Sequence, residues 1–72
     1  MFISEKTIIY MIINDLPMSH NTINIYLEYL NMVTQSNSAK FDMHCNIINN
    51  LTENEFTKYM TFLSINSKNK GE

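Results

Sequence analysis

The sequence predicts an all-α fold, a small bundle of three to four short helices that a second copy of the chain completes as a homodimer. Two observations carry this prediction. Helix start signals recur along the chain, and apolar residues follow them at spacings of three and four. With 72 residues and a single cysteine, the chain is limited to one domain and cannot be a disulfide scaffold. We place the helical domain at residues 1–65 and a flexible polar tail at residues 66–72.

The first predicted helix begins after Ser4, whose hydroxyl can cap it, and Pro17 ends it. The β-branched run over residues 8–13 is also compatible with a strand. We prefer the helix because the rest of the sequence offers no second strand as a partner. Its apolar positions form two adjacent stripes. One consists of Ile8, Ile12 and Leu16, and the other consists of Ile9 and Ile13.

The second predicted helix is capped by Ser19, and the polar residues 34–38 form the turn that follows it. Its apolar face consists of Ile23, Tyr26, Leu27, Leu30 and Val33. A third helix follows the turn. Its apolar face consists of Phe41, either Cys45 or His44, Ile48 and Leu51.

The start of the fourth helix is the clearest local signal, because Thr52 and Glu55 have the spacing of a capping box. The Thr52 hydroxyl can accept the Glu55 N–H, while the Glu55 carboxylate reaches back to the Thr52 N–H. Leu51 and Phe56 are placed to form a hydrophobic staple. The predicted apolar stripe of this helix is Phe56, Tyr59, Met60 and Leu63. Whether residues 38–63 form one helix or two stays open at this point.

Apolar residues make up 44% of the chain, more than one small core needs. We therefore expect apolar surface to remain after folding, and a homodimer is the simplest way to cover it. Tyrosine and methionine suit such contacts because they combine apolar area with a polar tip or an adaptable shape. The candidate interface residues are Tyr10, Tyr26, Tyr29, Met32, Tyr59 and Phe62.

The sequence offers few groups for catalysis or for a cofactor. Asp42, His44 and Cys45 are the only clustered metal ligands, and adjacent helical positions point about 100° apart, so they do not converge. For the same reason His44 cannot activate Cys45 as a nucleophile. Glu53 and Glu55 are explained by helix capping. We therefore expect a protein that is not an enzyme and that has no metal and no cofactor.

The charge balance argues against strong nucleic-acid binding, since the net charge is −2 and all five basic residues are lysines. Lys58, Lys68 and Lys70 are the candidates for weak, direct contact with nucleic acid. No apolar run approaches the length of a membrane span or the layout of a secretory signal. Together with the lone thiol, this leads us to expect no membrane partner and a cytoplasmic location.

Residues 19–30, SHNTINIYLEYL, resemble the central segment of the YmgB/AriR family. These are small bacterial biofilm and acid-resistance regulators, also called two-component-system connector proteins. The positions that match the family pattern are Ser19, Thr22, Ile23 and Leu27. With similar apolar spacing on either side, the resemblance covers about residues 8–51. It implies an all-α, dimeric regulator of stress responses or biofilm that acts through protein contacts and has no catalytic residues.

Two other interpretations of the function remain open. Residues 26–30 and 51–56 resemble parts of the Hha/YmoA family, which implies a partner of a nucleoid protein or a DNA-associated modulator of transcription. A small acidic chain is also compatible with an inhibitor of a host protein that a phage or plasmid encodes. The sequence does not identify the protein partner in any of these cases.

Overall fold

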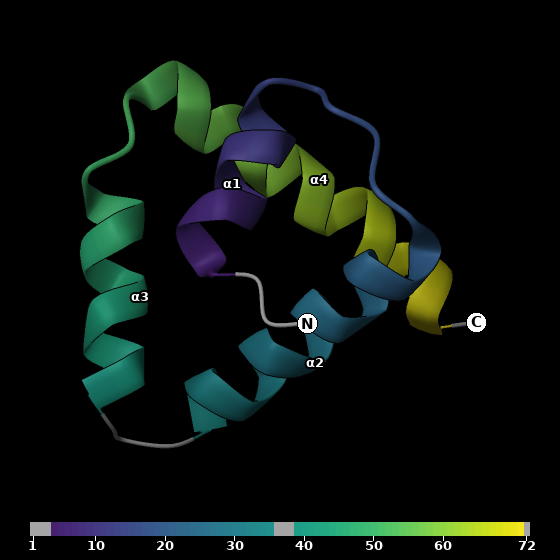
Figure 1. The fold of residues 1–72 in the computed structure, drawn as a ribbon, viewed down its shortest axis with the longest axis horizontal. Coiled ribbons are helices and arrows are strands. Elements are labelled where there is room, and N and C mark those ends of the chain that lie inside the picture. Colours follow the sequence, from purple (N-terminus) through teal and green to yellow (C-terminus); the bar gives the residue numbers. More distant parts are fainter. Residues whose placement is uncertain (1–3, 36–38, 72) are drawn as a thin grey trace.

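A computed structural model describes the backbone of residues 4–35 and 39–71 and the side chains of residues 4–35 and 39–67. Its helices are α1 (Glu5–Ile13), α2 (His20–Gln35), α3 (Ala39–Asn49) and α4 (Glu53–Gly71). The predicted all-α fold is confirmed, residues 8–13 are helical, and residues 38–63 contain parts of two helices rather than one. In Figure 1, α1 lies against α4, while α2 and α3 approach each other near the connection that joins them.

Polar side chains cap three of the helices as the sequence predicts. The Oγ atoms of Ser4 and Ser19 each accept the backbone N–H three residues on, at 3.3 and 3.1 Å. At the start of α4, the Glu55 N–H donates to Thr52 Oγ1 at 3.2 Å and the Thr52 N–H donates to Glu55 Oε1 at 2.9 Å. The reciprocal pair satisfies two backbone donors that a helix start otherwise leaves to water.

The C-terminal end of α1 is set by Asp15, whose φ of 57° lies in the left-handed region. The Leu16 N–H donates to the carbonyl of Met11 at 2.9 Å, and the Asp15 N–H donates to that of Ile12 at 3.2 Å. This pair of bonds is a Schellman motif, which normally places glycine where Asp15 stands. The helix therefore ends before Pro17 is reached, and the prediction that the proline ends it is corrected.

The apolar core is centred on α1. The fully buried apolar side chains among the described residues are Ile8, Ile9 and Ile12 of α1, Tyr26 and Val33 of α2, and Tyr59 of α4. Helix α3 contributes only half-buried side chains, chiefly Ile47 and Ile48, which pack against this core. The predicted apolar stripes of α1 and α2 are confirmed, except that Leu16 lies beyond the end of α1 and is exposed.

Helix α4 is rotated relative to the prediction. Tyr59, Phe62 and Leu63 face the core, whereas Phe56 and Met60 are exposed. Phe62, which the sequence places off the main face, therefore belongs to the inner face. Tyr59 and Phe62, three positions apart, lie on the buried side of α4. Phe56 and Met60 lie past the edge of that side, toward solvent.

Helix α4 continues past residue 65 as far as Gly71. Asn66 is half-buried, and its Nδ2 donates to the carbonyl of Phe62 at 2.8 Å. Glu72 lies outside the described residues. Within the part of the chain that the structure describes, no helix is both long and apolar enough to cross a bilayer.

Candidate functional site

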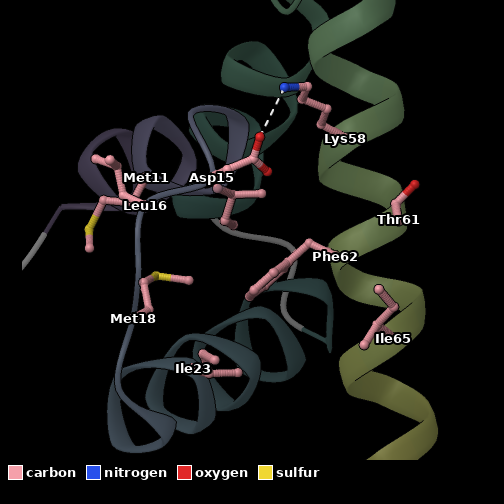
Figure 2. Close-up of a pocket in the computed structure, with 10 residues that line it drawn as sticks. Met11, Asp15, Leu16, Met18, Ile23, Lys58, Thr61, Phe62 and Ile65 are labelled. Atoms are coloured by element: carbon pink, nitrogen blue, oxygen red, sulfur yellow. Dashed lines mark hydrogen bonds and ion pairs between the residues drawn. The ribbon is translucent and has the colours of Figure 1, made fainter.

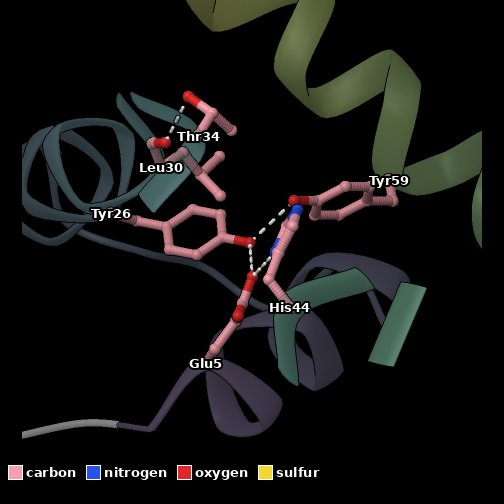
Figure 3. A network of polar contacts seen from close by, with 6 residues as sticks. All are labelled: Glu5, Tyr26, Leu30, Thr34, His44 and Tyr59. Carbon is pink, nitrogen blue, oxygen red and sulfur yellow. Dashed lines mark hydrogen bonds and ion pairs between the residues drawn. The ribbon is translucent and has the colours of Figure 1, made fainter. Parts of the chain in front are cut away.

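A network of hydrogen bonds joins one side chain from each of the four helices (Figure 3). Tyr26 Oη of α2 donates to Glu5 Oε2 of α1 at 2.8 Å, and it lies 2.7 Å from Tyr59 Oη of α4. His44 Nδ1 of α3 contacts the same oxygen of Glu5 at 2.5 Å. Glu5 is therefore the point where α1, α2 and α3 meet, and Tyr26 connects it to α4.

The chemistry of these groups fixes the direction of the bonds. A phenol has one hydrogen, and Tyr26 gives its hydrogen to Glu5. Tyr59 must then donate to Tyr26 Oη. A carboxylate oxygen only accepts, so His44 Nδ1 carries the hydrogen that it shares with Glu5. Every bond in the network thus leads toward the Glu5 carboxylate.

The network is buried. Tyr26 and Tyr59 are 1% and 2% exposed, and the side chains of Glu5 and His44 are 6% and 13% exposed. Burial raises the pKa of Tyr59 to about 12. Burial and the hydrogen bond with Tyr59 raise the pKa of Tyr26 well above its usual range. Both phenols are therefore uncharged near neutral pH, and the network joins the four helices to one another.

A second feature is an apolar hollow of about 330 Å³ that lies between α1, the segment leading into α2, and α4 (Figure 2). Its apolar lining is Met11, Ile12, Leu16, Met18, Ile23, Phe62 and Ile65. At one rim, Lys58 Nζ lies 3.2 Å from Asp15 Oδ2 and 3.4 Å from the carbonyl oxygen of Ile13. We call this feature the α1–α4 hollow.

Two further concave surfaces involve α4. The larger, about 610 Å³, lies between α2 and α4 and is lined by Leu27, Leu30, Met32 and Leu63 with polar neighbours. The other is a shallow surface on the outer side of α4 itself. The α1–α4 hollow and these two surfaces are each lined in part by methionine, leucine or isoleucine side chains.

The candidate interface residues do not form one surface. Tyr26 and Tyr59 are corrected, because both are buried and hydrogen-bonded to each other inside the chain. Tyr10 and Met32 are exposed, and they lie on different helices. Tyr29 and Phe62 are half-buried and pack against the core, although Phe62 also lines the α1–α4 hollow. The ring of Tyr29 stacks on that of Tyr26 with centroids 6.3 Å apart.

The lysine cluster is described only in part. Lys58 pairs with Asp15 rather than standing alone. The side chains of Lys68 and Lys70 lie outside the described residues. Of these three candidates for nucleic-acid contact, the structure therefore describes the side chain of Lys58 alone.

The predicted separation of Asp42, His44 and Cys45 agrees with their positions. His44 points into the network, while Cys45 is a free, half-buried thiol that lines a shallow surface with Asp42. Within the described ranges, no group of three His, Cys, Asp or Glu side chains is placed to hold a metal ion. Of the two alternatives for the apolar face of α3, His44 is the side chain that turns inward, and Cys45 is half-buried beside it.

Sequence reasoning missed Glu5 and His44 as parts of one buried cluster. Glu5 has an ordinary explanation in the first turn of α1, where an acidic side chain interacts favourably with the helix dipole. One signal was present, because Glu5 stands three and four positions before Ile8 and Ile9, on the stripe that is buried. An acidic residue on a buried stripe requires a hydrogen-bonding partner, which the tyrosines and the histidine supply.

The chain matches no model of a protein family, no curated protein and no solved structure.

Proposed function

We propose that this chain is a small regulatory protein that acts by binding another protein through the α1–α4 hollow. The observation that carries the proposal is the hollow itself, in which apolar side chains from three segments surround a concave space beside the Lys58–Asp15 pair. An apolar depression with a charged rim is the usual form of a site that receives an anchor side chain. Three methionine and leucine side chains, Met11, Leu16 and Met18, give the lining the adaptability that suits a protein segment.

The resemblance of residues 8–51 to the YmgB/AriR regulators supports the same class of function. It rests on apolar spacing, and the family assignment stays a proposal. The partner that fits the hollow is a protein segment with a projecting apolar anchor, such as a leucine or phenylalanine on a helix. The rim can accommodate a polar flank, because Lys58 and Asp15 are both exposed.

The test uses one charge in the hollow and one matched charge outside it. Leu16 is 44% exposed and lines the hollow, whereas Ile25 is 56% exposed and lies on α2 away from it. Proteins that bind the immobilised wild-type chain in a bacterial lysate are compared with those that bind Leu16→Asp and Ile25→Asp. We expect a partner that is retained by wild type and Ile25→Asp and lost by Leu16→Asp. Equal retention by all three chains, or no partner for any of them, contradicts the proposal.

A further inference from the structure

Helix α3 is the helix least embedded in the bundle. Each of the other helices buries at least one apolar side chain fully, whereas α3 buries none. The side chains of α3 that pack against the buried cluster are Ile47 and Ile48, both half-buried and both in its last turn. Figure 1 shows α3 at one edge of the molecule. A segment with few buried apolar contacts opens at a lower free energy than the core beside it.

The polar contact of α3 with the bundle is also limited. Among the described residues, the hydrogen bond between His44 and Glu5 is the one that joins α3 to another helix. When α3 moves away, both side chains reach water, so neither is left buried without a partner. Glu5 also keeps the hydrogen bond that Tyr26 donates. Opening of α3 therefore replaces one bond within the protein by hydration of its two groups.

The other three helices remain joined to one another without α3. Helix α1 lies against α4 (Figure 1). Tyr26 connects α2 to α1 through Glu5 and to α4 through Tyr59, and α3 takes no part in these two bonds. The α1–α4 hollow is lined by residues of α1, α2, α4 and the segment between α1 and α2. Removal of α3 therefore leaves both the three-helix unit and the hollow in place.

We propose that α3 opens as a unit while α1, α2 and α4 stay packed, and that the hydrogen bond between His44 and Glu5 holds it closed. The open chain exposes the Glu5 carboxylate beside the apolar side chains against which Ile47 and Ile48 pack in the closed chain. The bundle thus has a face that is covered when α3 is closed and accessible when α3 is open. This inference does not depend on the binding of a partner in the α1–α4 hollow.

Amide hydrogen exchange followed by NMR tests whether α3 opens separately. The exchange rate of a backbone N–H gives the free energy of the opening that exposes it, and the dependence of that rate on urea gives the surface exposed. We expect the α3 amides to be at least about tenfold less protected than the most protected amides of α1 and α4, and to depend less on urea. If the α3 amides match those of α1 and α4 in both respects, α3 opens only when the whole chain unfolds, and the inference is overturned.

Two substitutions in α3 test the role of the hydrogen bond. His44→Ala removes it, and Met43→Ala is the matched control, because Met43 is exposed on the same helix. We expect His44→Ala to accelerate exchange of the α3 amides at least about tenfold. Met43→Ala should change it by less than about twofold. Equal effects of the two substitutions would show that the bond does not hold α3 closed.

Tyr59→Phe provides the converse test, because Tyr59 bonds to Tyr26 whether α3 is closed or open. It should accelerate exchange of the most protected amides of α1 and α4 about fivefold. The exchange of the α3 amides should not change, since the three-helix unit loses the same bond in both states. An equal acceleration in α3 would show that all four helices open together and would overturn the inference.

Discussion

Replacing Tyr26 by phenylalanine removes the hydroxyl through which Tyr59 is connected to Glu5. The Glu5 carboxylate then loses one of its donors, and the Tyr59 hydroxyl is left buried without its acceptor. A hydrogen bond to a charged group contributes about 1.5–3 kcal/mol, and a buried polar group left unpaired costs about 1–3 kcal/mol. We therefore expect Tyr26→Phe to lower the free energy of unfolding by about 3–4 kcal/mol.

Tyr59→Phe is the informative comparison, because it removes only the donor at the outer end of the network. Tyr26 keeps its bond to Glu5, so the expected loss is about 1 kcal/mol. The double variant leaves no orphaned hydroxyl on either ring. It is expected to cost about 2–3 kcal/mol, less than the sum of the two single changes and less than Tyr26→Phe alone.

Urea denaturation followed by circular dichroism measures all three variants, and an unchanged dependence on urea concentration shows that the same unfolding reaction is compared. The total stability expected for a chain of this size, about 4–11 kcal/mol, leaves room for these losses. If Tyr26→Phe and Tyr59→Phe lower the free energy of unfolding equally, and the double variant lowers it by their sum, the inferred direction of the bonds is wrong. The two hydroxyl groups would then contribute independently.

Three further predictions concern pH, a helix cap and a turn. Because the pKa of Tyr59 is about 12 in the folded chain against 10.0 as its ordinary value, the folded state binds the proton more tightly. The free energy of unfolding should then be unaffected by this group below pH 10 and fall as the pH rises toward 12, and Tyr59→Phe should make the fall shallower in urea titrations at fixed pH. Thr52→Ala removes the acceptor for the Glu55 N–H and should lower the free energy of unfolding by about 1 kcal/mol, whereas Thr52→Ser should change it little. Equal melting temperatures for the two variants would contradict the role of the capping box. Asp15→Gly relieves the cost of the left-handed backbone at the end of α1 and loses only an exposed ion pair, so we expect the free energy of unfolding to rise by about 0.5 kcal/mol. Asp15→Val should lower it. A lower stability of the glycine variant would indicate that the ion pair with Lys58 contributes more than the backbone conformation costs.

The parts of the fold that depend on neighbouring residues could be predicted from the sequence. Ser4, Ser19 and the Thr52–Glu55 pair cap their helices through atoms three residues away, and that spacing is visible without a structure. The left-handed residue at Asp15 was not predicted, because the sequence signal for that turn is normally glycine.

The site depends on contacts between distant residues, which explains why it was missed. His44 and Cys45 are adjacent, and either one fits the apolar spacing of α3, so only the position of Glu5 on another helix decides which side chain turns inward. The same applies to Tyr26 and Tyr59, because an apolar ring with a hydroxyl group suits an interface as well as a core. Packing against α1 makes them internal.

The Glu5 network also has a consequence for the order of events during synthesis. Glu5 bonds to residues 21 and 39 positions later in the chain, and Tyr26 bonds to one 33 positions later. The first helix therefore leaves the ribosome long before Tyr59 can complete the network. Until Tyr26 and His44 have emerged, the Glu5 carboxylate stays hydrated, because burying the isoleucines of α1 would leave it without hydrogen-bond donors. The nascent chain should therefore remain open until α3 has emerged, and α4 should then complete the network through Tyr59.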